Sequence, residues 1–179
     1  MSEFSMALAA RVQWALHRVS VVAENQRAAQ THLSRALNGA KTCGDNAAWM
    51  DENLTCPALL ADVPDLRGAF TQAFDRVREQ RQKRRTRDGL TEELTVMAEE
   101  ANRGCGQSYE LFVKRFSADV DDLLEIVESP YQSIALDVAV SKGYATPAER
   151  EKMQEEIARD GGCSLTGIDP HYCPCGRHE

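Results

Sequence analysis

The residues of this chain that are best suited to chemistry lie at its C-terminal end. Residues 161–179 contain three of the six cysteines and two of the four histidines, with glycine and proline between them. Thiolate and imidazole are the ligands that Zn²⁺ prefers, and structural zinc sites hold four of them. The candidate ligands are Cys163, His171, Cys173, Cys175 and His178. We predict a Zn²⁺ site here, because a segment with so few apolar residues cannot fold by burial alone.

The spacing of these residues leaves several arrangements open. Cys173 and Cys175 are separated by one residue, so the segment lacks the C-x-x-C pair that is typical of zinc sites. A closed structural site would use the three cysteines with either His171 or His178. An open site with three protein ligands and a water would permit hydrolysis, although no nearby carboxylate has the spacing of a known general base. Without a metal, the thiols are either reduced and unligated or joined in disulfides.

A second candidate site is the basic segment 76–87, which contains seven basic residues and one acidic residue. The basic residues are Arg76, Arg78, Arg81, Lys83, Arg84, Arg85 and Arg87. They could bind the phosphates of a nucleic acid, pair with the acidic second half of the chain, bind another protein, or form a solvated helix end. No aromatic residues alternate with them to stack on bases, which counts against single-strand binding.

Composition limits the classes of function. The chain has 179 residues, is 42% hydrophobic and has a net charge of −7, which is typical of a globular protein. Residues 88–179 carry 19 acidic and 8 basic side chains, and such a surface can attract a basic protein. No apolar run approaches the roughly 20 residues of a membrane span, and the N-terminal residues make a poor signal peptide. We therefore expect a cytoplasmic protein without membrane contact.

Helical periodicity dominates the segments that must position these candidates. In the N-terminal segment, apolar residues recur at alternating steps of four and three, which is typical of a helix in a bundle or coiled coil. This stripe, in which Gln26 is the one polar residue, consists of Leu8, Val12, Ala15, Val19, Val22, Gln26, Ala29, Leu33 and Ala36. It predicts a helix from about Ser5 to Leu37, ended by Asn38-Gly39. A helix of that length needs either later helices or a second copy of the chain along its stripe.

The remaining segments are also predicted to be helical, apart from residues 40–63, which we expect to form a loop with one short helix around residues 47–52. Pro64 is suited to the first turn of a helix that buries Leu66, Phe70, Phe74 and Val77. Further helices are expected from Leu90 to near Gly104, after Ser108, after Ser129-Pro130 as far as Gly143, and from Thr146 to about Asp160, with a break at Asp88-Gly89. Thr146-Pro147-Ala148-Glu149 has the pattern of a capping box.

The predicted fold class is therefore all-α. A helical bundle with a long N-terminal helix occupies residues 1–160, and a short irregular Cys/His-rich tail occupies residues 161–179. No alternation typical of a β-strand occurs in the sequence.

The sequence contains none of the common catalytic or phosphate-binding motifs, including G-x-S-x-G, G-x-x-x-x-G-K-[ST] and H-E-x-x-H. We therefore predict a non-catalytic regulatory or inhibitory protein that binds a protein partner, for example in a nucleic-acid-handling complex, and has a structural zinc site. A homodimer would form through the N-terminal helix. One alternative is a nucleic-acid-associated protein that uses segment 76–87. A second alternative is a small zinc-dependent enzyme that uses the tail.

Overall fold

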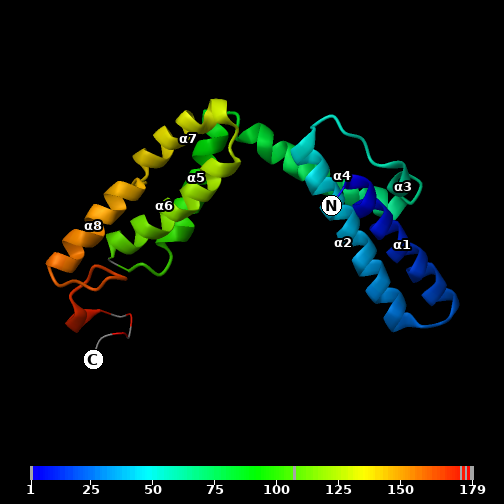
Figure 1. Ribbon diagram of the computed structural model, residues 1–179, viewed down its shortest axis with the longest axis horizontal. Helices are drawn as coiled ribbons and strands as arrows, with labels where there is room; N and C mark the ends of the chain where they lie inside the picture. The colour runs from blue at the N-terminus through cyan, green and yellow to red at the C-terminus, as the bar shows by residue number, and fades with distance from the viewer. Residues whose placement is uncertain (1, 107, 174, 176, 178–179) are drawn as a thin grey trace. The chain divides into compact units, whose positions relative to one another are not determined.

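The computed structural model of the protein describes residues 2–106, 108–173, 175 and 177, and these are mainly helical with no strand among them. The all-α fold class is confirmed. The elements in chain order are α1 (Glu3–Val22), α2 (Gln26–Met50), α3 (Ala58–Ala61), α4 (Pro64–Lys83), α5 (Arg87–Asn102), α6 (Tyr109–Ile126), α7 (Ser129–Ser141), α8 (Pro147–Arg159) and the 3₁₀ turn η1 (Pro170–Tyr172) (Figure 1).

The chain divides into two compact units, Met1–Gln82 and Lys83–Glu179. The Cys/His-rich segment 161–179 belongs to the second of them. In the described part of the chain, no helix combines the length and the apolar character that a membrane crossing requires.

The first unit is built on a hairpin of α1 and α2. The chain reverses at residues 23–25, where Glu24 has a left-handed backbone with φ of 56°. Asn25 then caps α2, because its side-chain oxygen accepts a hydrogen bond from the Ala28 amide at 3.1 Å. The predicted long N-terminal segment is therefore helical, but it consists of two antiparallel helices, and the later helix packs on the earlier one.

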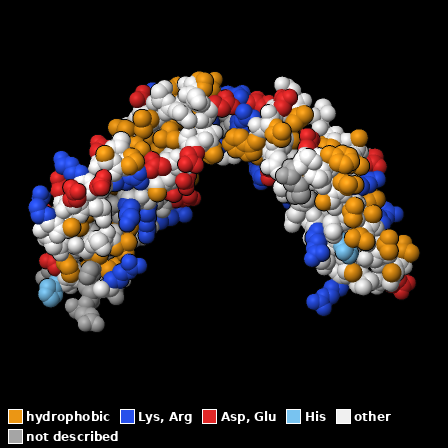
Figure 2. Space-filling model, viewed as in Figure 1, with side chains coloured by type: hydrophobic (Ala, Val, Ile, Leu, Met, Phe, Trp, Pro, Cys, Tyr) orange, Lys and Arg blue, Asp and Glu red, His pale blue; other side chains and the backbone are white. Residues whose placement is uncertain are grey.

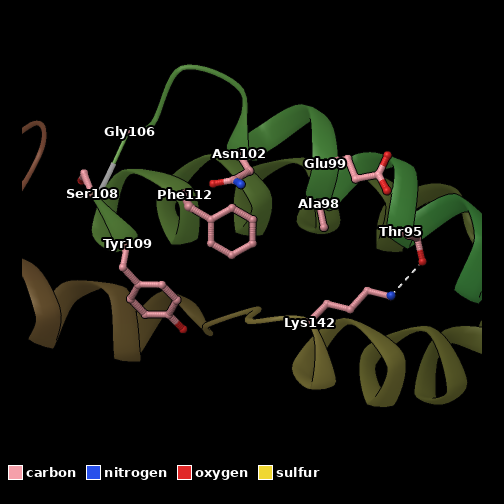
Figure 3. Close-up of a pocket in the computed structure, with 9 residues that line it drawn as sticks. All are labelled: Thr95, Ala98, Glu99, Asn102, Gly106, Ser108, Tyr109, Phe112 and Lys142. Carbon is pink, nitrogen blue, oxygen red and sulfur yellow. Dashed lines mark hydrogen bonds between the residues drawn. The ribbon is translucent and has the colours of Figure 1, made fainter.

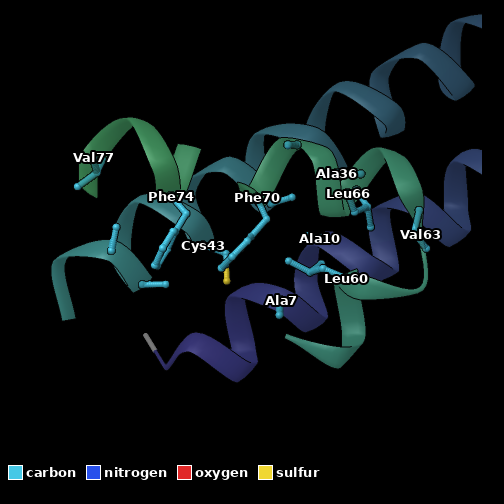
Figure 4. Packing of buried hydrophobic residues seen from close by; sticks show 14 residues of the cluster. Ala7, Ala10, Ala36, Cys43, Leu60, Val63, Leu66, Phe70, Phe74 and Val77 are labelled. Carbon is cyan, nitrogen blue, oxygen red and sulfur yellow. The ribbon is translucent and has the colours of Figure 1, made fainter. Parts of the chain in front are cut away.

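Glycines inside α2 serve packing. A Cβ on Gly39 would lie 3.1 Å from the Cβ of Ala10, and a Cβ on Gly44 would lie only 2.3 Å from the carbonyl oxygen of Phe70. The helix continues through both positions to Met50, so the predicted stop at Asn38-Gly39 and the predicted loop from residue 40 are wrong. Figure 4 shows the small residues Ala7, Ala10 and Ala36 in the core of this unit.

Helix α4 agrees with its prediction. It begins at Pro64, and its residues Leu66, Phe70, Phe74 and Val77 are buried in the first unit. It ends at Lys83, and the Thr86 hydroxyl caps α5 by accepting a hydrogen bond from the Gly89 amide at 3.1 Å. The predicted break at Asp88-Gly89 is therefore wrong by a few residues, since both lie in the first turn of α5.

The second unit buries larger side chains between α5, α6 and α7. Leu90, Leu94, Phe116 and Val120 have no exposed surface. The predicted boundaries of its helices are confirmed at three caps, which are Ser108 before α6, Gly143 after α7, with a φ of 101°, and the capping box of Thr146 and Glu149 before α8. The last of these helices, α8, ends at Arg159, directly before the cysteine-containing segment.

Candidate metal centre

Three cysteines of the second unit bring their sulfur atoms together. The Sγ atoms of Cys163, Cys173 and Cys175 all lie within 4.8 Å of one another. The Sγ atoms of Cys163 and Cys175 are 3.7 Å apart, and none of the six cysteines, all of them described, is in a disulfide. Two sulfurs bound tetrahedrally to Zn²⁺ at about 2.3 Å are about 3.8 Å apart. The donor set and its spacing therefore fit a thiolate metal site.

A closed loop positions Cys163. Its backbone N–H donates to the Ile168 carbonyl at 2.9 Å, and its own carbonyl accepts from the Gly167 N–H at 2.7 Å. The amide of Leu165 donates to the Cys163 sulfur at 3.4 Å. An N–H directed at sulfur favours the thiolate, which is the form that binds metals.

Gly167 allows this loop to approach α6. Its backbone has a φ of 70°, and a Cβ there would lie 2.9 Å from the carboxylate of Glu110. The left-handed backbone favours glycine, whereas the Glu110 side chain is flexible and could move aside. The loop is therefore shaped by its backbone as well as by its cysteine.

Cys173 enters the site from η1. The side chain of Asp169 accepts a hydrogen bond from the His171 amide at 2.8 Å and so caps this turn. The hydroxyl of Thr166 lies 3.0 Å from the Cys173 sulfur. Thr166 therefore links the Cys163 loop to the second cysteine.

The site is attached to the helical core through Ser108. The Ser108 hydroxyl donates to the Thr166 carbonyl and accepts from the Leu111 amide at the start of α6. Ser108 and Thr166 are both buried. One serine thus caps a helix and holds the cysteine loop against it.

Electrostatics at the site depend on the neighbouring thiols. The backbone N–H of Arg177 lowers the pKa of Cys175, but the Cys173 thiol, burial and the Cys163 thiol together outweigh it, so the net pKa of Cys175 is raised. Adjacent sulfurs oppose one another's ionisation because two thiolates repel. A bound cation reverses this effect and favours the thiolates.

The structure thus brings together three of the five predicted ligands. His171 is exposed on η1 and lies outside the group of three sulfurs. His178 lies outside the described residues. Sequence reasoning missed the Leu165 amide, the Thr166 hydroxyl and Ser108. A backbone amide leaves no signal in residue types, and Ser108 is identified from sequence only as a helix cap.

The basic segment 76–87 is extensively paired with acidic side chains. In the first unit the N···O distances are 2.8 Å for Arg76–Asp45, 3.0 Å for Arg78–Asp75 and 3.7 Å for Arg81–Glu52; in the second they are 3.9 Å for Lys83–Glu92, 2.6 Å for Arg84–Glu93 and 2.7 Å for Arg85–Glu128. Arg87 is exposed. The predicted pairing with the acidic second half of the chain is found for Lys83, Arg84 and Arg85. Arg76, Arg78 and Arg81 pair instead with acidic residues of the first half.

A cavity of about 480 Å³ opens between α5, α6 and the end of α7 in the second unit (Figure 3). Its lysine, Lys142, donates to the Thr95 hydroxyl at 2.7 Å, and its serine, Ser108, donates to the Thr166 carbonyl. Among the described residues that line it, there is neither a cysteine nor a histidine. The Lys142 and Ser108 side chains of this cavity are therefore engaged within the chain.

The cluster of three thiols is the strongest chemical feature of the described chain, and its interpretation rests on this chain alone. No protein-family model, curated protein or solved structure matches the chain.

Proposed function

We propose that this chain is a non-catalytic regulatory or inhibitory protein that binds a protein partner and folds its C-terminal segment around a structural Zn²⁺. The observation that carries the metal assignment is the 3.7 Å separation of the Cys163 and Cys175 sulfurs in a group that also includes Cys173. Three thiolates supply three of the four ligands of a tetrahedral zinc site. His171 or His178 would supply the fourth.

The surroundings of the cluster support a structural role for the metal. The loop is closed by backbone hydrogen bonds at Cys163 and tied to α6 through Ser108. A metal ion would fix the remaining segment against this base, since the segment has few apolar residues to bury. A site built in this way stabilises a fold and needs no open coordination position.

Two observations support a binding role for the rest of the protein. The Lys142 and Ser108 side chains of the cavity in the second unit are engaged in hydrogen bonds within the chain, as expected of groups that do no chemistry there. Residues 88–179 carry 19 acidic and 8 basic side chains, and such a surface can attract a basic protein partner.

The metal is tested by elemental analysis of the purified protein and of matched cysteine variants. We expect about one Zn²⁺ per chain and a loss of most of it in Cys163→Ser and Cys175→Ser. Cys105→Ser is the control, because Cys105 belongs to the same unit and is buried outside the cluster, with its thiol donating to the Ala101 carbonyl at 3.0 Å. Zinc content that is absent from the wild type, or equal in all variants, would contradict the proposal.

The two alternative functions predict different results. A nucleic-acid-associated protein would bind DNA or RNA with an affinity that falls steeply with salt and is reduced by Arg87→Gln. A zinc enzyme would keep a water on the metal, so its zinc would show three protein ligands. Our proposal predicts a zinc ion with four protein ligands. It also predicts that no binding to DNA or RNA is detected at physiological salt.

A further inference from the structure

The large apolar side chains of α1 lie on the face that α2 does not cover. Val12 is 47% exposed, Val19 is 64% exposed and Val22 is 83% exposed, whereas Ala7 and Ala10 are fully buried. Figure 2 shows hydrophobic side chains gathered along the surface over α1. The helix thus turns Ala7 and Ala10 to the core, with Met6 and Trp14 partly buried against it. Its other large apolar residues face outward, where an ordinary amphipathic helix has polar ones.

The exposed residues have a regular spacing. Leu8, Val12, Ala15, Val19 and Val22 follow at steps of four, three, four and three residues. This average period of 3.5 residues forms a straight seam only when a helix pairs with another helix in a coiled coil. The occupant that the pattern fits is therefore a helix with the same period.

We propose that this face of α1 binds α1 of a second copy of the chain as a parallel, two-stranded coiled coil. Val12 and Val19 occupy the a position of the heptad, and Leu8, Ala15 and Val22 occupy the d position. Valine at both a positions and leucine at one of the three d positions are residues that favour two parallel strands. The chain therefore carries a self-complementary seam.

The residues that border the seam are compatible with the parallel orientation. Arg11 and Arg18 lie on one edge, at heptad position g, and the opposite edge at position e is formed by the uncharged Leu16 and Ala23. In a parallel pair, each arginine faces Leu16 or Ala23 of the second copy, and its aliphatic stem can cover that residue. In an antiparallel pair with valine and alanine layers in register, Arg11 of one copy would approach Arg18 of the other, and like charges would repel.

Both arginines are held at this edge by contacts within the first unit. The Arg11 guanidinium donates to both carboxylate oxygens of Asp62, at 2.9 and 2.8 Å. The Arg18 guanidinium lies 5.4 Å from the centre of the Trp14 ring. The guanidinium groups are therefore occupied beside the seam, and the seam itself contains no charged residue.

The seam is short. Leu8 to Val22 spans about 21 Å of helix, or about two heptads, so the dimer is expected to be in equilibrium with monomer. Sedimentation equilibrium of the full chain between about 1 and 300 µM, where mass action shifts such an equilibrium, should show the mass rising from that of one chain toward that of two.

A pair of matched variants locates the interface. Val12→Glu should raise the dissociation constant of the dimer at least tenfold, because it places a charge in the centre of the seam. Val96→Glu is the control, since Val96 is also a half-exposed helical valine but lies on α5 of the second unit. A chain that is monomeric at every concentration, or equal effects of the two variants, would overturn the proposal.

Cysteine cross-linking tests the orientation. In a parallel pair, the Val12→Cys variant should form a disulfide after oxidation between position 12 of one copy and position 12 of the other. The linked peptide of residues 12–18 contains no other cysteine. An antiparallel pair would instead link Val12→Cys to Ala15→Cys in a mixture of the two variants, and this result would overturn the proposal. Binding of a monomeric chain to phospholipid vesicles through the same face would also overturn it.

Discussion

The two units of this protein bury their helices in different ways. In Met1–Gln82, α1 meets α2 through alanine and glycine, so that the two backbones lie close together. In Lys83–Glu179, α5, α6 and α7 meet through leucine, valine and phenylalanine. Small residues give a close helix pair but leave the larger side chains of α1 outside, where they are available to a partner. The second unit buries large residues such as Leu90, Leu94 and Phe116 between its helices, and its C-terminal segment contains the thiol cluster.

The largest expected effect is in the core of the second unit. Phe116 has no exposed surface and stacks on Phe112 with the ring centres 5.5 Å apart. Phe116→Ala should lower the free energy of unfolding by about 3–5 kcal/mol, because it removes buried area and leaves a cavity. Urea denaturation at low protein concentration measures this loss.

The matched change in the first unit is Leu8→Ala. Leu8 is 42% exposed on α1, so its loss should cost less than about 1 kcal/mol in the monomer. Equal losses for Phe116→Ala and Leu8→Ala would show that the large residues of α1 are as buried as those of α6, and the contrast between the units would fail.

The next effect tests the close packing of the first unit. Gly44→Ala would place a Cβ 2.3 Å from the Phe70 carbonyl oxygen, so α2 and α4 must separate. We expect a loss of about 3 kcal/mol in the free energy of unfolding, at the upper end of the usual cost of overpacking.

Gly68→Ala is the control for this prediction. Gly68 lies inside α4, and a Cβ there meets nothing within 4 Å. The substitution should stabilise the protein by about 0.5–1 kcal/mol, because alanine is the better helix former. If both variants were stabilised in thermal denaturation, the close approach of α2 and α4 would be refuted.

Substitutions in the basic segment 76–87 should have a smaller effect on the free energy of unfolding. The effect should differ between Arg84 of the second unit and Arg76 of the first. The side chain of Arg84 is only 9% exposed and makes three hydrogen bonds to the Glu93 carboxylate, whereas that of Arg76 is 69% exposed. Arg84→Gln should cost about 2 kcal/mol, since it leaves a partly buried carboxylate without its cation. Arg76→Gln should cost less than about 0.5 kcal/mol. The reverse order in chemical denaturation would mean that the segment is not built into the fold.

The smallest effect is a pH dependence at Cys43 in α2. Burial, the carboxylate of Glu3 and the Cys56 thiol raise the pKa of Cys43 from 9.0 to about 11. The unfolded thiol ionises first, so the stabilisation is complete below pH 9 and is lost as the pH rises through 11. Between pH 8 and pH 10 this group should remove about 1 kcal/mol of stability, and Cys43→Ala should abolish that part of the alkaline decline. An identical decline in the variant would rule the thiol out as its source.

The fold could be predicted well where a polar side chain marks a helix end. Ser108, Thr146 and Glu149 cap helices as predicted, because each needs only local hydrogen bonds. The turn at residues 23–25 was missed, since it contains neither glycine nor proline and depends on a left-handed Glu24. Gly39 and Gly44 were misinterpreted as parts of a stop and a loop, because their role depends on contacts with Ala10 and Phe70 that lie far away in the sequence.

The candidate site could be predicted at the level of its ligands. Cysteine and histidine types alone identified Cys163, Cys173 and Cys175, and the fold brings these three together. The spacing did not predict the loop that aims the Leu165 amide at the Cys163 sulfur, because a backbone donor is independent of residue type. The assignment of the fourth ligand stays a prediction between His171 and His178.

The central claim is that the clustered thiols of the second unit hold a metal ion. X-ray absorption at the zinc edge of the purified protein measures the ligands of that ion directly. We predict three sulfur ligands at about 2.3 Å and one nitrogen ligand at about 2.0 Å, in a tetrahedral arrangement. A spectrum without sulfur ligands, or a purified protein that takes up no zinc under reducing conditions, would contradict the account.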